Sequence, residues 1–462
     1  ISYKFSNCCR EAIRNSHTRM RKIVLVLTVF FSVCLTTQAQ SFKFDFGTGR
    51  VKKGYTAVTP DSKFANEKGY GFTNGSDVTA VDRGGKTIND DYITSTKPFY
   101  FSVNVPDGNY DVKIILGDKK GTSATTVRAE CRRLFLENIR TEKGKFVTET
   151  FTVNVRDSLI RNEKGNIVTA VKLKSREYNY LHWDNFLTIE FNDSLPKVCA
   201  IEITPNKTAT TIFLAGNSTV VDQDKEPWAA WGQMIPRFFE PGKAAVANYA
   251  ESGEALNSFL SARRLEKILS LMKPGDYLFI EFGHNDMKQK GPGIGPFTSY
   301  KKLLKQYIAE VKKKGGIPVL VTSMHRRNFD KAGKIINTLL EYPEAVRQTA
   351  KEENVAVVDL NAMSKVLYET WGPEKSLKAF VHFPANTFPG QTSKLEDNTH
   401  FTTYGAYELA KCIVKSIQAQ NLPLANLLRA DISAYDPASP LAFERFYWPM
   451  SAFSTSGKPD GN

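Results

Sequence analysis

A serine and a histidine in the second half of the chain have the surroundings that acyl-transfer chemistry requires. Ser218 lies in the segment AGNST, where Gly216 permits a tight turn that presents the hydroxyl at the tip of a strand. His400 ends the segment DNTH, and a spacing of three residues lets the carboxylate of Asp397 reach its imidazole. That contact fixes the imidazole tautomer and leaves the other ring nitrogen for a serine. A lone serine or loop histidine is more often structural, so neither segment is sufficient by itself.

Two further polar segments offer hydrogen-bond donors to a negatively charged oxygen. Gly253 ends the segment AESG and can turn its backbone N–H towards a substrate oxygen. Asn285 lies in the segment FGHND at the end of a buried strand, and its side-chain amide can donate to a developing oxyanion. Each segment alone also fits an ordinary turn. The four segments together, in this order, are far more specific than any one of them.

The elements that must position these residues alternate between strand and helix. A helical pattern of apolar residues runs from Leu256 to Met272, between the second and third strands. Strict alternation of this kind predicts a parallel sheet with helices on both faces, and ligands bind such sheets at the carboxyl ends of the strands. The predicted strands span residues 211–216, 245–250, 277–283, 317–323 and 355–360.

The first half of the chain has a different period. Short runs of alternating apolar and polar residues are separated by turn clusters such as Pro106-Asp107-Gly108-Asn109, which is typical of an antiparallel β-sandwich. The predicted strands are Tyr100 to Val105, Tyr110 to Leu116, Lys145 to Val155, Ile167 to Leu173 and Asn185 to Phe191.

These patterns predict a β-sandwich over residues 40–195, a linker over residues 196–208 with a short strand-like stretch between two prolines, and an α/β domain over residues 209–430. Residues 431–462 form an irregular tail, rich in proline and aromatic residues, that we expect to pack onto a domain surface.

The amino-terminal segment has the features of an export signal. Met20 and the basic residues after it precede an apolar run from Ile23 to Leu35 and small residues that suit signal peptidase, so residues 20–39 are predicted to be a signal peptide. Residues 1–19 then form a spurious upstream extension. We expect a secreted or periplasmic protein. A surface lipoprotein anchored at Cys34 is the less favoured alternative, because the residues before it fit such a processing site poorly.

Composition narrows the classes of partner. The formal net charge is +14, and removal of residues 1–39 with their six basic residues and one acidic residue leaves +9. A basic protein favours acidic partners, and for an exported protein these are acidic polysaccharides rather than nucleic acid. No apolar run is long enough for a stable membrane insertion. Cys131, Cys199 and Cys412 are widely spread and odd in number, which predicts neither a disulfide framework nor a zinc site.

The four segments resemble those of the SGNH/GDSL hydrolase family, and most closely the rhamnogalacturonan acetylesterases. The resemblance covers roughly residues 209–420 and implies a flavodoxin-like domain with a five-stranded parallel sheet. It implies Ser218 as nucleophile, His400 as general base and Asp397 as its partner. The oxyanion hole would consist of the N–H groups of Ser218 and Gly253 and the side chain of Asn285. No metal or cofactor is implied.

Asn217 departs from the family pattern, which has aspartate at this position. An asparagine side chain keeps the hydrogen bonds of the turn but not the charge, so we expect activity to be retained. The predicted activity is removal of O-acetyl groups from an acetylated polysaccharide or oligosaccharide of the plant cell wall, most closely rhamnogalacturonan or pectin.

Substrate contacts are predicted in two places. His325, Arg326 and Arg327 follow the fourth strand, where cations can meet a uronate carboxylate, although a solvated basic turn explains them equally well. Trp228 and Trp231 follow the nucleophile and either stack on sugar rings or pack in the core of a helix. Both interpretations stay open.

The first domain resembles galactose-binding-like carbohydrate modules. The resemblance rests on the segment FDFG near its start and the segment HWDN before a late strand. It implies that Tyr70, Phe72 or Trp183 could line a sugar site, although aromatic residues of a sandwich are usually core. Binding of a sugar or an ion by this domain is left open.

Two alternatives accompany the preferred function. An esterase with the same triad could act on acetylated xylan, another decorated glycan or a lipid ester. A catalytically silent carbohydrate-binding protein could also keep this fold. Hydrolysis of a small acetyl ester, compared between the wild type and Ser218→Ala, distinguishes an enzyme from a binding protein.

Overall fold

The structure is a computed structural model that describes residues 40–420 and 422–460. The predicted upstream extension (residues 1–19) and signal peptide (residues 20–39) lie outside the described residues. Within the described residues, none of the helices has both the length and the apolar character needed to cross a bilayer.

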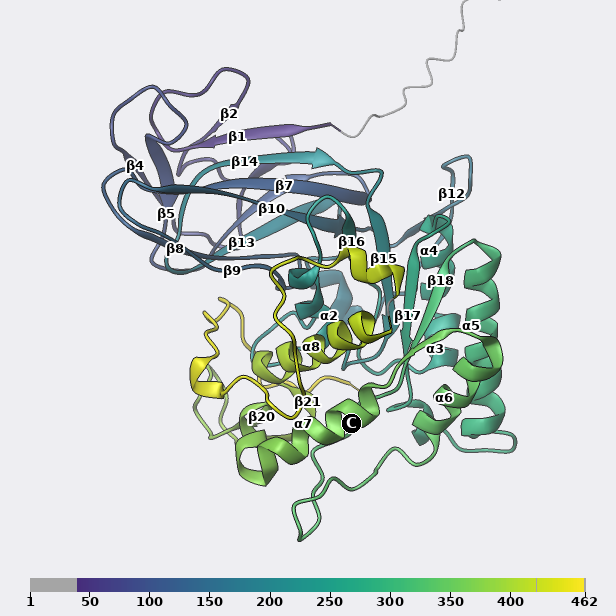
Figure 1. Ribbon diagram of the computed structural model, residues 1–462. Helices are drawn as coiled ribbons and strands as arrows, with labels where there is room; N and C mark the ends of the chain where they lie inside the picture. The colour runs from purple at the N-terminus through teal and green to yellow at the C-terminus, as the bar shows by residue number, and fades with distance from the viewer. Residues whose placement is uncertain (1–39, 421, 461–462) are drawn as a thin grey trace, which may run out of the picture. The chain divides into compact units, whose positions relative to one another are not determined.

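The first domain is a sandwich of two mainly antiparallel sheets (Figure 1). One sheet has the strand order β10-β7-β14-β1-β2, with β5 pairing β14 and β4 at its side. Its strands are β1 (Phe42–Phe46), β2 (Thr56–Val58), β4 (Thr79–Asp82), β5 (Asp91–Thr94), β7 (Gly108–Gly117), β10 (Phe146–Val155) and β14 (Lys197–Pro205). The other sheet has the order β3-β6-β13-β8-β9. Its strands are β3 (Tyr70–Thr73), β6 (Phe99–Asn104), β8 (Ser123–Ala129), β9 (Arg133–Thr141) and β13 (Phe186–Leu195).

Aromatic side chains join the two sheets. Phe44 and Phe46 of β1 meet Phe101 of β6 at ring-centroid distances of 5.0 and 4.9 Å. Phe72 lies 5.6 Å from Phe101 in the same cluster and is buried. Phe72 is therefore a core residue, and its predicted place in a sugar site is wrong. Tyr70 is half-buried and packs against Phe44.

The predicted linker over residues 196–208 is wrong for most of its length. Residues 197–205 form β14, which pairs antiparallel with both β7 and β1 in the middle of the sheet. Pro196 and Pro205 lie just before and at the end of the strand, where proline costs least ladder bonding. Only residues 206–209 connect the sandwich to the next strand. The predicted strand at 167–173 also differs, because β12 (Ile167–Ala170) pairs only with β11 (Leu159–Arg161) in a separate ribbon.

The second domain contains the predicted five-stranded parallel sheet, in the order β16-β15-β17-β18-β19. Its strands are β15 (Thr210–Gly216), β16 (Ala244–Asn248), β17 (Tyr277–Glu281), β18 (Ile317–Val321) and β19 (Ala356–Val358). The α-helices around it are α2 (Trp231–Met234), α3 (Leu256–Ser261), α4 (Arg264–Leu271), α5 (Lys301–Lys313), α6 (Tyr342–Glu353), α7 (Leu360–Lys375) and α8 (Thr403–Ala419). The predicted fold class is confirmed.

Helices cover both faces of this sheet, and successive side chains of each strand point to opposite faces. Ile212 and Leu214 of β15 join a cluster with residues of α2, α7 and α8. Phe213 and Ala215 join a second cluster with residues of α3, α4, α5 and α6. Figure 1 shows these two groups of helices on the two faces of β15, β17 and β18. The helical pattern from Leu256 to Met272 is divided between α3 and α4 by Arg263, which has a left-handed backbone.

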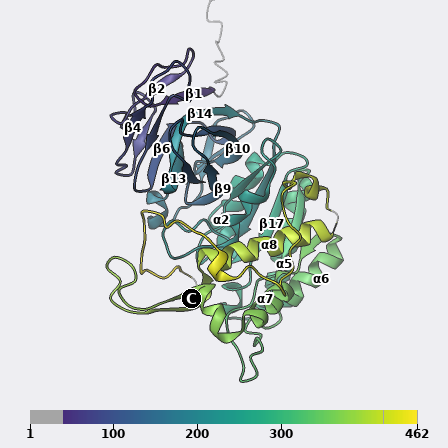
Figure 2. The ribbon, with the colours of Figure 1, turned by 60° about the vertical axis from the view of Figure 1, so that its left-hand side comes forward.

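The segment after α8 returns across the second domain to the sandwich. Tyr435, Phe446 and Trp448 pack against the core cluster that contains α8. Further along, Ser451 bonds through its hydroxyl to Tyr100 of β6 at 3.0 Å. Figure 2 shows this segment in yellow beside α8.

Candidate active site

The four polar segments meet at the carboxyl edge of the parallel sheet. Ser218, Gly253 and Asn285 follow β15, β16 and β17. His400 lies in β21 (Leu395–Phe401), which pairs with β20 (Phe380–Phe383) and leads into α8. The carboxyl ends of parallel strands lie at one edge, so this topology brings together residues that are up to 182 positions apart.

Ser218, His400 and Asp397 form a continuous hydrogen-bonded relay. The Ser218 Oγ lies 2.8 Å from His400 Nε2, and His400 Nδ1 lies 2.8 Å from Asp397 Oδ2. All three residues are buried. The two imidazole nitrogens are thus engaged on opposite sides, which is the arrangement that lets an imidazole take a proton from a hydroxyl while a carboxylate holds it in place.

Asp397 is held in its charged form. Burial by itself raises the pKa of this carboxyl, but hydrogen bonds from the His400 ring and from the backbone N–H groups of His400 and Thr399 outweigh that effect and lower the pKa to about 2. The two backbone donors lie 3.0 and 2.7 Å from Oδ1. Asp397 is therefore a carboxylate at neutral pH and can stabilise a positive charge on His400.

Side-chain hydrogen bonds stabilise the turn that carries Ser218. Asn217 Oδ1 accepts bonds from Thr219 N (3.0 Å) and Thr219 Oγ1 (2.9 Å), so the asparagine side chain supplies acceptors within the turn as expected. Thr219 Oγ1 also lies 3.1 Å from Oε1 of Glu281, the last residue of β17. Burial raises the pKa of Glu281 to about 7, against the opposing effect of hydrogen bonds from Trp231 and Thr219.

Trp231 belongs to this support and not to a sugar platform. Its side chain is fully buried, and its indole Nε1 donates to Glu281 Oε2 at 2.8 Å. The predicted stacking of Trp231 on a sugar is therefore wrong, because α2 turns this face into the core beneath the sheet edge.

Trp228 is placed differently. Its indole ring meets the His400 ring edge-on at a centroid distance of 5.8 Å. The residue is 2% exposed, yet it lines a cavity of about 280 Å³ together with Gln223, Ser252 and Lys458. It therefore packs directly against the imidazole at the floor of that cavity.

Two of the three predicted oxyanion donors, Gly253 and Asn285, follow β16 and β17, the strands on either side of β15. Gly253 has φ +83°, a backbone conformation that favours glycine. Asn285 Nδ2 donates to the Glu254 carbonyl at 2.9 Å, which ties the third segment to the second. An amide group carries two N–H donors, so this bond occupies one and orients the other.

The three predicted cations after β18 are largely engaged within the protein. His325 is buried, and burial lowers its pKa to about 4, so it is neutral near pH 7 and not the predicted cation. Arg326 Nη1 donates to Thr338 Oγ1 at 3.2 Å, and Arg327 Nε donates to Ser376 Oγ at 2.9 Å. Both arginines are half-buried and bind neighbouring loops, and the choice between a uronate contact and a solvated turn stays open for them.

The sandwich contributes residues that sequence analysis missed. Arg133 Nε and Arg156 Nη2 lie 3.4 and 4.0 Å from Asp222 Oδ2, and Arg132 Nη2 lies 2.8 Å from Glu226 Oε2. All five side chains are buried. We call these five residues the charged seam. Asp222 and Glu226 lie in the loop of residues 219–230 that follows Ser218, the predicted nucleophile, so the seam joins the sandwich to this loop, which we call the nucleophile loop.

A second contact from the sandwich side reaches the turn of Gly253. Arg176 Nη2 lies 2.5 Å from Glu251 Oε1, and Lys174 Nζ lies 3.0 Å from Glu254 Oε1. Lys174 also donates to the carbonyl of Ser252. The turn of Gly253 is thus held between its own domain and the segment that precedes β13.

Trp183 lies in the same region and is not a sugar contact. Its indole Nε1 donates to Glu177 Oε1 at 3.0 Å, and its ring packs against Tyr249 at a centroid distance of 5.7 Å. The residue is buried in the core cluster of the second domain. Its predicted place in a sugar site of the sandwich is therefore wrong.

The C-terminal segment also reaches the site. Lys458 Nζ lies 3.5 Å from Asp397 Oδ2, and Asp460 lies against Gly253 and pairs with Arg176. Nothing in the sequence near Lys458 signals this position, because the contact depends on the path of the chain after α8.

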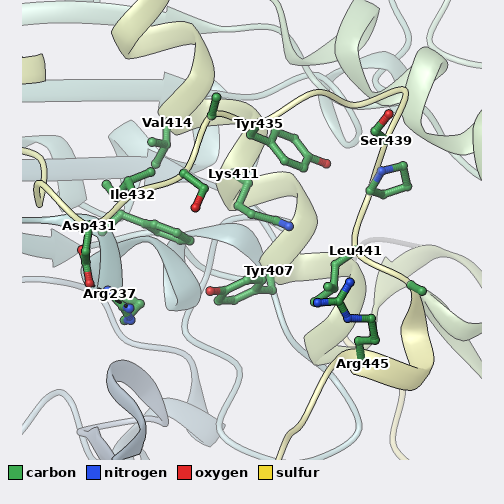
Figure 3. A pocket seen from close by; sticks show the side chains of 15 residues that line it. Arg237, Tyr407, Lys411, Val414, Asp431, Ile432, Tyr435, Ser439, Leu441 and Arg445 are labelled. Atoms are coloured by element: carbon green, nitrogen blue, oxygen red, sulfur yellow. Dashed lines mark ion pairs between the residues drawn. The ribbon is translucent and has the colours of Figure 1, made fainter.

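A second cavity, of about 540 Å³, lies between η2 (Ile235–Phe238), α8 and the segment after α8 (Figure 3). Tyr407 and Lys411 of α8 line it together with Arg237, Tyr435 and Arg445. It contains none of the four polar segments. The smaller cavity is lined by Ser252 of the second polar segment and by Trp228, which packs against His400.

Known proteins match both domains. Residues 42–175 match a family described as beta-agarase/YXIM esterase-like, galactose-binding domain-like. Residues 214–405 match the GDSL-like lipase/acylhydrolase family, and this range includes Ser218, Asn285 and His400. The two resemblances expected from the sequence are confirmed.

Two relatives and a solved structure of one of them define the similarity further. Rhamnogalacturonan acetylesterase RhgT of Bacillus subtilis is 44% identical over 219 residues, which cover 47% of this chain and 93% of RhgT. The uncharacterized esterase YxiM of the same organism is 26% identical over 390 residues, which cover 82% of this chain and 91% of YxiM. A crystal structure of Bacillus subtilis YxiM aligns with 83% of this chain and 99% of that chain, at 26% identity and a TM-score of 0.43.

The match covers nearly the whole length of RhgT and about half of this chain. The match to the family model extends from β15 to α8 and so includes the sheet edge at which the relay lies. The chain is an esterase and belongs to the GDSL-like lipase/acylhydrolase family.

Proposed function

We propose that this protein is a carbohydrate esterase that removes O-acetyl groups from rhamnogalacturonan, with Ser218 as nucleophile, His400 as general base and Asp397 as its partner. One observation carries the proposal. The Ser218 hydroxyl, the His400 imidazole and the Asp397 carboxylate are linked by two hydrogen bonds of 2.8 Å each. A serine hydroxyl is a poor nucleophile at its ordinary pKa, and an adjacent base removes that obstacle.

The reaction proceeds in two acyl-transfer steps. Ser218 Oγ attacks the acetyl carbonyl carbon while His400 Nε2 takes the hydroxyl proton, and the resulting imidazolium is stabilised by Asp397. The tetrahedral intermediate collapses as His400 returns the proton to the departing sugar hydroxyl, which leaves an acetyl group on Ser218. Water then attacks this ester with His400 again as base, and acetate leaves as the Ser218 hydroxyl is restored.

The negative charge of each intermediate is stabilised by the oxyanion donors. These are the N–H groups of Ser218 and Gly253 and the second N–H of the Asn285 amide, whose first N–H is held by Glu254 O. Trp228, whose ring packs against the His400 imidazole, lines a cavity that is the proposed place of the acetylated sugar.

The polysaccharide is proposed from two considerations. RhgT is named a rhamnogalacturonan acetylesterase. A second Bacillus subtilis relative, YesY, is named a probable rhamnogalacturonan acetylesterase and is 36% identical over 219 residues. The net charge of +9 that is left after removal of residues 1–39 also favours an acidic polymer over a neutral one.

Acetate release from acetylated rhamnogalacturonan, acetylated homogalacturonan and acetylated xylan tests the substrate. We expect the first polymer to be the best substrate for the wild type and none to be deacetylated by Ser218→Ala. Deacetylation of xylan with pectic polymers untouched would contradict the proposed substrate. A wild type that binds the polymer but shows no esterase activity would favour a carbohydrate-binding protein.

Export is part of the proposal. Residues 20–39 are proposed to be a signal peptide that directs the protein to the periplasm or the medium. Sequencing the amino terminus of the protein recovered from cell fractions tests this point, and a start near Gln40 is expected. A mature protein that begins with a lipid-modified Cys34 would indicate a surface lipoprotein instead.

A further inference from the structure

The sandwich reaches the nucleophile loop through one buried turn. The hairpin of β8 and β9 ends in Glu130, Cys131 and Arg132, each 2% exposed. A hairpin turn usually lies in solvent, and this one is covered by the loop that follows Ser218. Glu130 and Arg132 have φ values of +57° and +59°. Residues with a side chain adopt this backbone at a conformational cost, so surrounding contacts must stabilise it.

The Arg132 guanidinium binds three points of the nucleophile loop at once. Its Nη1 donates to the backbone carbonyls of Gln223 (3.1 Å) and Trp228 (3.0 Å). Its Nη2 forms the ion pair with Glu226 at 2.8 Å. A planar guanidinium presents several donors in one rigid plane, which suits it to hold a loop in a single conformation.

The same loop touches both ends of the relay. Gln223 Nε2 donates to the backbone carbonyl of Ser218 at 3.0 Å. Trp228 packs edge-on against the His400 ring, and Ala229 N donates to the carbonyl of Phe401, the residue after His400, at 2.9 Å. The residues that Arg132 binds are therefore in direct contact with the nucleophile and the base.

A side chain of the second domain closes the arrangement. Gln233 Nε2 donates to the carbonyl of Cys131 in the hairpin turn (2.7 Å) and to the carbonyl of Gln223 in the loop (2.8 Å). The hairpin turn and the loop are thus joined from both sides, and no part of this junction is exposed enough to be screened by solvent.

We propose that Arg132 is a positioning residue for the esterase reaction, and that the sandwich uses its β8–β9 turn to hold Ser218 and His400 at reactive distance. The inference rests on the proposed roles of Ser218 and His400. It gives the sandwich a part in catalysis that needs no sugar bound to it. Displacement of reacting groups by about 1 Å costs an enzyme about 100-fold in rate, so a loosened loop is expected to act on kcat.

The test is Arg132→Met, with kcat expressed per active site titrated by a serine-directed phosphonate. With a small acetyl ester as substrate, we expect kcat to fall about 10- to 100-fold and KM to change less than about threefold. Arg132→Lys should lose less activity, because an ammonium keeps the pair with Glu226 but cannot bridge both carbonyls.

Lys267→Met is the matched control. Lys267 is fully buried on α4 and pairs across the same domain junction with Asp107 (2.5 Å) and Asp157 (3.0 Å), but it touches no residue of the relay or of the nucleophile loop. We expect this variant to melt at a lower temperature, with kcat per titrated site within about twofold of the wild type. Equal loss of kcat in both variants, or in neither, would overturn the proposal.

Two further measurements keep the outcome decisive. If Arg132→Met does not fold, Gln223→Leu removes only the amide that reaches the Ser218 carbonyl, and an unchanged kcat in that variant would overturn the proposal. The wild type and Ser218→Ala are assayed beside these variants. An inactive wild type or an active Ser218→Ala would refute the proposed function itself, which separates that failure from the failure of the positioning role.

Discussion

The carboxyl edge of the parallel sheet and the charged seam hold buried charges in opposite ways. At the edge, Asp397 and His400 are three residues apart, and local backbone donors keep the carboxylate ionised. In the seam, Arg132 binds backbone groups 91 and 96 residues away, and burial raises the pKa of Asp222 against the effects of Arg133 and Arg156. The edge links a hydroxyl, an imidazole and a carboxylate in one local relay, whereas the seam depends on long-range pairing of charged side chains.

The largest effect should come from the edge. Ser218→Ala removes the attacking oxygen, and we expect kcat for a small acetyl ester to fall by about 10⁵- to 10⁶-fold. The thermal midpoint should change little, because the turn keeps its Asn217–Thr219 bonds. Ser270→Ala, which alters an exposed serine of α4, serves as control and should retain full activity. Comparable activity in both variants would show that the edge is not the catalytic centre.

In the seam, the expected loss is first one of stability. Asp222→Asn leaves Arg133 and Arg156 without their shared carboxylate, and removal of one partner from a buried pair typically destabilises a protein by about 3–5 kcal/mol. Urea unfolding followed by circular dichroism measures this change. The control Asp61→Asn alters an exposed carboxylate and should leave the midpoint unchanged. Equal midpoints for the two variants would mean that the seam pairs add nothing to stability.

A smaller loss should follow at the oxyanion donors. Asn285→Ala is expected to lower kcat by about 10²- to 10³-fold, which corresponds to about 3–4 kcal/mol of transition-state stabilisation. Steady-state kinetics with a small acetyl ester provide the measurement. Asn257→Ala, an exposed position at the start of α3, should behave like the wild type. If Asn285→Ala kept more than about a third of the wild-type kcat, its side chain would have no place in the oxyanion hole.

The smallest effect concerns pH. The pKa of Asp397 is lowered from 3.8 to about 2, so its contribution to stability is complete above pH 4 and is lost as the pH falls towards 2. The difference amounts to about 2 kcal/mol. We expect the unfolding free energy of the wild type to fall more steeply between pH 5 and pH 2 than that of Asp397→Asn. Parallel pH curves for the two proteins would contradict the lowered pKa.

The comparison also explains which features could be predicted. The five parallel strands and the four polar segments have local signatures, since a buried strand followed by a turn residue is visible within about ten positions. The spacing from Asp397 to His400 is equally local, and the structure brings both residues to Ser218. The catalytic roles of these residues, and of Gly253 and Asn285, stay predictions.

Features that depend on distant partners could not be predicted in this way. The sequence around Trp231 and Trp183 does not distinguish a buried tryptophan from an exposed, sugar-binding one. The structure shows that both are buried and that they donate hydrogen bonds to Glu281 and Glu177. The sequence predicts a linker at β14 because a proline lies near each end of this segment, whereas pairing with β1 and β7 determines its place in the sheet. The sequence around Arg132 does not predict its hydrogen bond to the carbonyl of Trp228, which is 96 residues away.

The position of β14 has a consequence for anyone who wishes to shorten or recombine this enzyme. A cut anywhere in residues 197–205 removes a middle strand from the sandwich, and a cut at residues 206–209 strips Asp222 and Glu226 of their guanidinium partners. The isolated esterase domain would expose the carboxyl groups of Asp222 and Glu226 to solvent, where they are buried in the whole chain. Modular exchange between such enzymes therefore has to carry both halves together, or redesign the face that they share.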